Sequence, residues 1–416
     1  MEVIVYPGTI NGTLTAPPSK SAAQRAIIIA SLAPGDSQLW FPGSCKDVIA
    51  VIKACQNLGA SITQSNHTLN IKGGITLPSG EISCGESGLG IRILSAVAST
   101  FSSEVVLTAE GTLRQRKMDS LSKAIIAMGA ECITKEGKAP VSVKGPLKGG
   151  TAHIDGQDSS QVLSGLLIAA PLALSDVHLI VDNLKSIPYI DLSLQMMKSF
   201  GVEVKHEQYK EFYIKAPQTY KPSHITIEGD WSSASFLLVA GAIAGRITVT
   251  NLNPESAQAD KKILDALALA GANIHVGPHE VTVSTSSLKA FEFDASHCPD
   301  LFPPLLALAS CCEGESIITG TDRLHNKESN RAFTLYNEFG KMGVPVRIEN
   351  NIMRISGCKI KGAHTESHSD HRIAMACAVG ALRASGPVSI SGAEAVNKSY
   401  PDFFEQLNMV INSSRT

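Results

Sequence analysis

Leu58-Gly59-Ala60-Ser61-Ile62 is the first of five similar segments that set the organisation of this chain of 416 residues. The pattern recurs around Gly129, Gly201, Gly271 and Gly343, at a spacing of roughly 70 residues. Each segment follows a run with helical periodicity, such as 121–128 or 263–270, and precedes a strand-like alternation. Each glycine is therefore predicted to end a helix before a strand, and we interpret the recurrence as a structural repeat.

A second series of segments is polar, and each member opens an apolar helix in step with the glycines. Its members are Ser19-Lys20-Ser21, Glu86-Ser87-Gly88, Ser159-Ser160-Gln161, Trp231-Ser232-Ser233, Pro299-Asp300 and Asp370-His371-Arg372. Together the two series predict six units of helices and short strands, an α/β or α+β class. The period exceeds the roughly 20 to 50 residues of helical-repeat arrays and favours two closed domains of three units each.

The polar helix starts favour anions, because free N–H groups and the helix dipole attract negative charge there. Pro17 and Pro18 stop a preceding strand, Ser19 can cap the next helix, and Lys20 and Arg25 lie in its first two turns. The alternative is that such residues only cap helices, and this is what we expect for Trp231-Ser232-Ser233. Capping does not require Lys20, Arg25, Arg92, His371 or Arg372, so for the other helix starts we predict a cleft that attracts anions.

The composition, net charge and cysteine spacing exclude several classes of protein. A content of 44% hydrophobic and 18% charged residues indicates a soluble globular chain, and a net charge of -2 argues against nucleic-acid binding through bulk electrostatics. The N-terminus does not resemble a signal peptide, and the apolar run 162–174 is too short to span a membrane. The nine cysteines form no Cys-x-x-Cys pair, which favours buried thiols over disulfides or zinc. We expect a cytoplasmic monomer without metal, cofactor, membrane or nucleic-acid partner.

Taken in order, these motifs resemble those of the enolpyruvyl transferase family, and most closely its branch that acts on shikimate 3-phosphate, from about residue 7 to residue 407. The resemblance implies an α/β (α+β) fold of two inside-out barrel domains, each with three pseudo-symmetric repeats. Domain one would comprise 1–18 and 229–416, domain two 19–228, and the substrates would lie between them. The implied reaction transfers the enolpyruvyl (carboxyvinyl) group of phosphoenolpyruvate to the 5-hydroxyl of shikimate 3-phosphate and releases phosphate, in the shikimate pathway of aromatic amino-acid biosynthesis.

The resemblance also implies a set of site residues. Matched to shikimate 3-phosphate are Lys20, Ser21, Arg25, Ser159, Ser160, Gln161, Ser186, Tyr189, Asp300 and Lys327. Matched to phosphoenolpyruvate are Lys20, Gly88, Arg116, Gln161, Arg331, Arg372 and Lys398. The catalytic candidates are Asp300, Glu328, Lys20, Lys398 and His371. We expect Asp300 to act as base toward the 5-hydroxyl, Glu328 to carry the proton at C3 of phosphoenolpyruvate, and Lys20 to stabilise charge near the bridging oxygen.

Four positions depart from the family's motifs. Glu86 stands in place of an asparagine near phosphoenolpyruvate and Leu89 in place of a threonine, while Lys117 replaces a proline and Asn330 an aspartate. A carboxylate about 5 Å from a ligand phosphate would cost roughly 3 kcal/mol at an effective dielectric constant of 20. Glu86 is therefore expected to turn away from the ligand or to pair with a cation such as Arg92 or Arg116.

Two other functions compete with this interpretation. The sister family that transfers the same group to UDP-N-acetylglucosamine usually carries a cysteine acid in the loop equivalent to 110–116, and this loop has none. A scaffold protein that keeps the fold without catalysis is the second alternative. Lys20, Asp300, Glu328 and Lys398 argue against it, because a scaffold requires none of them.

Overall fold

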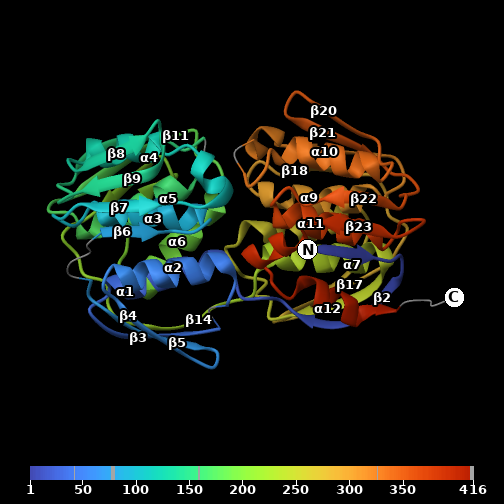
Figure 1. Cartoon of the computed structure of the whole chain (residues 1–416), viewed down its shortest axis with the longest axis horizontal. Helices are drawn as coiled ribbons and strands as arrows, with labels where there is room; N and C mark the ends of the chain where they lie inside the picture. The colour runs from blue at the N-terminus through green and yellow to red at the C-terminus, as the bar shows by residue number, and fades with distance from the viewer. Residues whose placement is uncertain (42, 76–79, 158–159, 326, 413–416) are drawn as a thin grey trace. The chain divides into compact units, whose positions relative to one another are not determined.

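The computed structural model describes residues 1–41, 43–75, 80–157, 160–325 and 327–412 (Figure 1). The chain forms two compact units. The continuous unit is Pro18–Ile227, and the split unit combines Met1–Pro17 with Glu228–Thr416.

The described residues of the continuous unit form three sheets that share one pairing pattern. In each, the first two strands are parallel and the remaining neighbours are antiparallel. The sheets are β14(His224–Thr226)-β3(Gly35–Trp40)-β5(Thr68–Gly73)-β4(Ser61–Ser65), β6(Gly80–Ser83)-β7(Val105–Thr108)-β9(Lys138–Lys144)-β8(Glu131–Lys135) and β10(Gly150–Asp155)-β11(Val177–Asp182)-β13(Glu211–Ile214)-β12(Lys205–Glu207).

The described residues of the split unit also form three sheets. They are β16(Asn273–Val276)-β17(Glu280–Ser284)-β15(Gly245–Thr250)-β2(Thr9–Thr15)-β24(Ile411–Asn412), β18(Glu292–Asp294)-β19(Glu315–Thr319)-β21(Ile352–Ser356)-β20(Val346–Glu349) and β1(Glu2–Val5)-β23(Val388–Ser391)-β22(Ala363–Glu366). Strand β2 pairs with β15 on one side and with β24 on the other, so the N-terminal segment supplies an interior strand.

Among the described residues, each unit has three helices that are almost wholly buried, and these carry the predicted polar starts. They are α1(Lys20–Leu32), α3(Gly88–Ala98) and α5(Ser160–Ala169) in the continuous unit, and α7(Trp231–Ala244), α9(Phe302–Ala309) and α11(His371–Ala381) in the split unit. Helix α3 packs on α1 and α5, and α9 packs on α7 and α11. A helix that is apolar on all sides is stable only inside a core, which explains why these six are covered by other elements.

The second set of helices is only partly buried. It comprises α2(Lys46–Asn57), α4(Asp119–Ala127), α6(Ile187–Ser199), α8(Ile263–Leu269), α10(Arg331–Lys341) and α12(Phe403–Val410). The first five of these are each followed by one of the five repeat glycines. All five glycines have a left-handed backbone, with φ between +78° and +106°. The prediction that these glycines end helices is therefore confirmed, and so is the predicted phase of the polar helix starts.

The apolar run 162–174 does not form one helix. Helix α5 ends at Ala169 and is followed by the short 3-10 helix η2(Ala170–Leu172). Pro171 accounts for the break, because its ring cannot continue an α-helix. Among the described residues, no helix combines the length and the apolar character that a membrane crossing needs.

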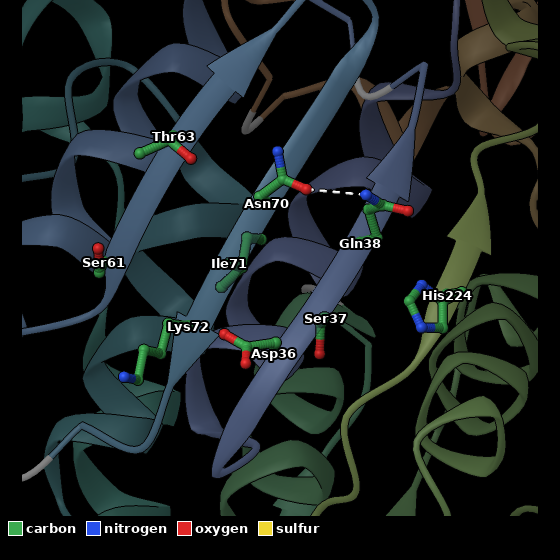
Figure 2. A pocket seen from close by; sticks show the side chains of 9 residues that line it. All are labelled: Asp36, Ser37, Gln38, Ser61, Thr63, Asn70, Ile71, Lys72 and His224. Atoms are coloured by element: carbon green, nitrogen blue, oxygen red, sulfur yellow. Dashed lines mark hydrogen bonds between the residues drawn. The ribbon is translucent and has the colours of Figure 1, made fainter.

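The outer face of the sheet formed by β14, β3, β5 and β4 carries a polar hollow of about 360 Å³ (Figure 2). Gln38 on β3 donates a hydrogen bond to Asn70 on β5 at 2.9 Å, and Thr63 and Lys72 lie on the same face. Leu39, Leu69 and Ile71 alternate with them and are buried. This is the alternation expected of a sheet with one solvated face, and the hollow contains none of the predicted site residues.

Candidate active site

In the continuous unit, the start of α1 places Lys20 beside a carboxylate that the sequence motifs had not assigned. Ser19 caps the helix, since its hydroxyl accepts a hydrogen bond from the Ala22 N–H. The Lys20 ammonium lies 2.9 Å from an oxygen of Asp47 on α2. Both side chains are largely buried, and Asp47 thereby holds the expected two-substrate lysine at the helix start.

Arg25 lies one turn further along α1 and is 1% exposed. Its guanidinium donates to the Ser193 and Ser164 hydroxyls at 2.8 and 3.2 Å, and to the carbonyls of Ser21 and Tyr189. Burial lowers the pKa of Arg25 to about 10, so it remains charged at neutral pH. Arg25 therefore joins α1, α5 and α6, and its expected contact with a substrate phosphate stays a prediction.

The start of α3 is hydrogen-bonded to both α1 and α5. Ser87 caps the helix at the Gly90 N–H and donates to Gln24 of α1 at 2.6 Å. Arg92 donates to the Gly88 carbonyl at 2.8 Å and to Gln161 on α5 at 3.1 Å.

Arg116 lies directly over Gly88. A β-carbon on Gly88 would be 2.7 Å from Arg116 Nη1, so a side chain there would displace the guanidinium. Gly88, Arg116 and Gln161, all expected at phosphoenolpyruvate, are thus neighbours. Ser160 begins α5, and Ser159 lies outside the described residues.

Ser186 immediately precedes α6 with a left-handed backbone, φ 57° and ψ 44°, and is 3% exposed. This conformation is uncommon for a residue other than glycine and costs on the order of 1 kcal/mol. The first turn of the helix supplies the Tyr189 carbonyl that accepts from Arg25. Ser186 and Tyr189 thus lie at the helix start that Arg25 reaches.

Glu86 points toward the loop that precedes Arg116. Its carboxylate atoms lie 2.4 to 2.7 Å from the position that a β-carbon on Gly111 would occupy. Gly111 begins the 3-10 helix η1(Gly111–Gln115), which leads to Arg116. A side chain at position 111 would therefore displace the Glu86 carboxylate.

In the split unit, Arg331 at the start of α10 is the centre of a cluster of three carboxylates. It donates to Asp370 through Nε at 2.9 Å and Nη2 at 3.2 Å, to Asp300 at 2.7 Å and to Glu328 at 2.6 Å. The side chain is 0% exposed. Burial opposes its charged form, but the carboxylates of Asp370, Glu328 and Asp300 raise the pKa of Arg331 above its usual value. Its predicted contact with phosphoenolpyruvate would compete with these carboxylates.

Asp300, in the 3-10 helix η4(Pro299–Leu301), faces three cations. Lys327 Nζ and Arg331 Nη1 lie 3.1 and 2.7 Å from one oxygen, and Arg372 Nη2 lies 3.1 Å from the other. Burial opposes ionisation of Asp300, but these cations outweigh it and hold its pKa well below its usual range. Burial also lowers the pKa of Lys327, against the attraction of Asp300. In this arrangement Asp300 is ionised but is a weak base.

Arg372 joins the cluster to His371 and to the start of α7. Its Nη1 lies 2.8 Å from His371 Nε2, and its Nη2 donates to the Ser232 hydroxyl at 2.8 Å. Because a guanidinium can only donate, His371 Nε2 accepts and the neutral ring carries its hydrogen on Nδ1. Within the part of the chain that the structure describes, Arg372 Nε has no hydrogen-bond partner although it is buried. That N–H is a donor available to a ligand oxygen.

Lys398, the last predicted member, ends the 3-10 helix η6(Ala393–Lys398) and is 7% exposed. Helix η6 packs on α11, whose first turn contains His371 and Arg372. Six of the seven predicted residues of the split unit are joined by hydrogen bonds or ion pairs in one cluster: Asp300, Lys327, Glu328, Arg331, His371 and Arg372.

Several residues that complete these clusters have no predicted site role, although Asp370 belongs to one of the polar helix starts. Asp370 accepts from Arg331 and Ser329 and caps α11 at the Arg372 N–H. The expectation that Trp231-Ser232-Ser233 only caps a helix is wrong for Ser232, because Asp230 is the cap and the Ser232 hydroxyl contacts Arg372. Asp260 was also missed. No sequence signal distinguishes it from an acid in the first turn of an exposed helix.

No group of three or more His, Cys, Asp or Glu side chains among those described is arranged to hold a metal ion. Both clusters instead combine arginines and lysines with carboxylates, a donor set suited to anions.

Comparison with known proteins points in one direction. A family model described as EPSP synthase (3-phosphoshikimate 1-carboxyvinyltransferase) matches residues 5–407. A 3-phosphoshikimate 1-carboxyvinyltransferase of Methanocorpusculum labreanum is 36% identical over 98% of this chain and 98% of the relative. One of Thermococcus kodakarensis is 38% identical over 97% of this chain and 98% of the relative. A solved structure of EPSP synthase from Acinetobacter baumannii matches 99% of this chain and 98% of its own, with a TM-score of 0.84 at 27% identity.

Proposed function

Because the chain belongs to the EPSP synthase (3-phosphoshikimate 1-carboxyvinyltransferase) family, we propose that its two clusters carry out that family's reaction with the residue roles given below. The enolpyruvyl group of phosphoenolpyruvate is transferred to the 5-hydroxyl of shikimate 3-phosphate, and phosphate is released. The hydroxyl adds to C2 while C3 takes a proton. The tetrahedral adduct then expels phosphate and loses a proton from C3.

The observation that carries the proposal is the set of three cations around Asp300. Phosphoenolpyruvate is a small trianion, and its oxygens compete with Asp300 for Arg372 and Lys327. Arg372 Nε, buried and without a partner among the described residues, supplies a further donor. As these cations turn to the ligand, the pKa of Asp300 rises from its depressed value, and the carboxylate becomes a competent base toward the 5-hydroxyl.

Glu328 is proposed as the proton carrier at C3. Its carboxylate lies 2.6 Å from Arg331 Nη2, which fixes its orientation. Arg331 is itself held by Asp370, so the carrier is positioned by a buried, rigid pair. His371, as a neutral ring, orients Arg372, and Lys398 supplies a further positive charge for phosphoenolpyruvate.

Lys20, Arg25, Arg116 and Gln161 are proposed to bind the same two substrates from the continuous unit. Lys20 stabilises charge near the bridging oxygen, and Asp47 holds its ammonium in place. Neither unit alone contains both the Lys20 and the Asp300 clusters. The reaction therefore requires the substrates to contact both units at once.

Phosphate release tests the proposal directly. Purified protein is mixed with phosphoenolpyruvate and shikimate 3-phosphate, and with phosphoenolpyruvate and UDP-N-acetylglucosamine in a parallel tube. We expect release only in the first tube. Release only in the second would assign the sister activity, and release in neither would support a scaffold without catalysis.

The role of Asp300 is tested by Asp300→Asn. Loss of the base is expected to lower kcat by about 100-fold or more, the usual range for one acid–base group. Asp294→Asn, at an exposed position of β18 in the same segment, is the matched control and is expected to retain the kcat of the wild type. Equal kcat values for the two variants would refute the assignment.

We also propose that the protein acts as a monomer in the cytoplasm. All nine cysteines are free, and six of them are buried with a pKa raised by burial, which suits a reducing compartment. Light scattering at micromolar concentration measures the mass directly. A mass near 43.9 kDa is expected, and twice that value would contradict the proposal.

A further inference from the structure

Asp260 is a buried carboxyl group with no role in the proposed reaction steps. It lies in the 3-10 helix η3(Ala259–Lys262), which packs against α7, and it is 2% exposed. Its side chain is hydrogen-bonded to Ser232 in the first turn of α7. Burial of an aspartate disfavours its ionised form, so the groups around Asp260 decide its charge.

The direction of the hydrogen bonds connects Asp260 to Arg372. Arg372 Nη2 donates to the Ser232 oxygen at 2.8 Å, because a guanidinium has no acceptor. The Ser232 hydroxyl hydrogen is then directed to the Asp260 carboxylate. The same Nη2 lies 3.1 Å from Asp300, so Asp260, Ser232, Arg372 and Asp300 form one continuous chain.

Several charged groups act on Asp260 from the elements around it. Asp300 and Asp230 disfavour its ionisation, whereas Arg372 and the Ser232 hydroxyl favour it. The Cys298 thiol also interacts with it, and Lys262 of the same helix is bonded to Asp265. Burial and the negative charge of Asp300 prevail and raise the pKa of Asp260 to about 7.

We propose that Asp260 is a positioning residue for phosphoenolpyruvate: through the Ser232 hydroxyl it orients Arg372, and it takes up a proton from solvent when the anionic substrate binds. This inference rests on the proposed function. An ionised Asp260 attracts Arg372 and repels the anionic ligand. When Asp260 is neutral, the positive charge of Arg372 interacts with the ligand without this competition. Binding and protonation of Asp260 therefore favour each other.

The test compares the KM for phosphoenolpyruvate of the wild type and Asp260→Asn between pH 5.5 and 8.5, at saturating shikimate 3-phosphate. The asparagine mimics the neutral carboxyl at every pH. The ratio of the wild-type KM to the variant KM is expected to be near 1 at pH 5.5 and to rise about tenfold by pH 8.5, the effect of one charge about 10 Å away at an effective dielectric constant near 20. Its midpoint should lie near pH 7.

Asp265→Asn removes an exposed acid from the neighbouring helix α8 and is the matched control. Its KM should follow that of the wild type at every pH. A purely structural role of Asp260 would lower kcat or stability without changing the pH profile, so a ratio that is constant with pH would overturn the proposal.

Ser232→Ala supplies a second test if Asp260→Asn does not fold. It removes the link but keeps the titrating group, so KM for phosphoenolpyruvate should rise at every pH while its pH dependence remains. Ser235→Ala, which removes a hydroxyl bonded to the Ser232 carbonyl, is the control. An unchanged KM in Ser232→Ala would refute the chain of contacts. Absence of phosphate release from the wild type would instead refute the proposed function, and with it this use of Asp260.

Discussion

Arg331 shows how one residue stabilises the predicted site. Three carboxylates of like charge, Asp300, Glu328 and Asp370, could not be buried together without a central cation. The planar guanidinium has enough donors to reach all of them, which an ammonium could not do in the same geometry. The motif that carries Arg331 therefore has a structural function as well as a proposed catalytic one.

Arg331→Met should destabilise the protein strongly. The substitution leaves Asp370, which is 0% exposed, without its counterion, and breaking a buried pair in this way costs about 3–5 kcal/mol. Arg347→Met is the control, because Arg347 is 64% exposed and its pairing with Glu315 is worth under about 1 kcal/mol. Urea unfolding measures both. Similar losses in the two variants would contradict the central role of Arg331.

Because of Asp260, we expect the free energy of unfolding to depend on pH even without substrate. Its pKa of about 7 in the folded chain lies above the value of about 3.9 of an exposed aspartate. The folded state therefore binds this proton more tightly than the unfolded state, so the contribution of Asp260 is fully present below about pH 4 and is lost as pH rises through about 7.

Relative to Asp260→Asn, the wild type should thus lose stability between about pH 4 and pH 7, by up to about 4 kcal/mol. The difference should be constant above about pH 8. Urea unfolding of the two proteins across this range measures it. A difference that does not change with pH would show that Asp260 is ionised in both states.

At the scale of single elements, the effect of backbone conformation can be tested at two glycines where an added β-carbon causes no steric clash. Gly59 follows α2 with φ +106°, and a β-carbon there would meet nothing within 4 Å. Gly340 lies within α10 in helical conformation, and its added β-carbon would also meet nothing. The two positions differ only in backbone conformation.

Gly59→Ala should destabilise the protein by about 1 kcal/mol, because the left-handed region is unfavourable for alanine. Gly340→Ala should stabilise it by about 0.5–1 kcal/mol, since glycine is a poor helix former. Thermal or urea unfolding gives both signs. The same sign in both variants would mean that packing, and not backbone conformation, decides these positions.

At the scale of the whole molecule, the division of the chain predicts unequal folding of fragments. The continuous unit, residues 18–227, has its own core and needs no residue from outside that range for its three sheets. The fragment 18–227 should therefore fold alone and unfold cooperatively, as judged by circular dichroism and size exclusion. It should release no phosphate, because Asp300 and Arg372 are absent.

The fragment 228–416 should not fold alone. It lacks β2, which lies between β15 and β24, and β1, which pairs with β23. Adding a peptide of residues 1–17 should restore cooperative unfolding by supplying both strands. Cooperative folding of 228–416 without that peptide would show that the N-terminal strands are dispensable.

The sequence by itself determined the elements and their repetition. Gly59 and its equivalents, together with the polar starts such as Ser19 and Asp370, act within a few residues of chain, so helix ends could be predicted from local chemistry. The family resemblance, and not the helix pattern, implied most members of the two clusters, including Lys327 and Arg331.

Only the tertiary structure decided which charges meet. The decisive contacts join residues about 27 to 140 positions apart in the chain. They are those of Asp47 with Lys20, of Asp370 with Arg331, and of Ser232 with Asp260 and Arg372. No local periodicity encodes such pairs, since the burial that makes an aspartate costly and the cation that compensates it arise only when separate repeats pack together. That packing, and not the motifs, lowers the pKa of Asp300 and raises the pKa of Asp260.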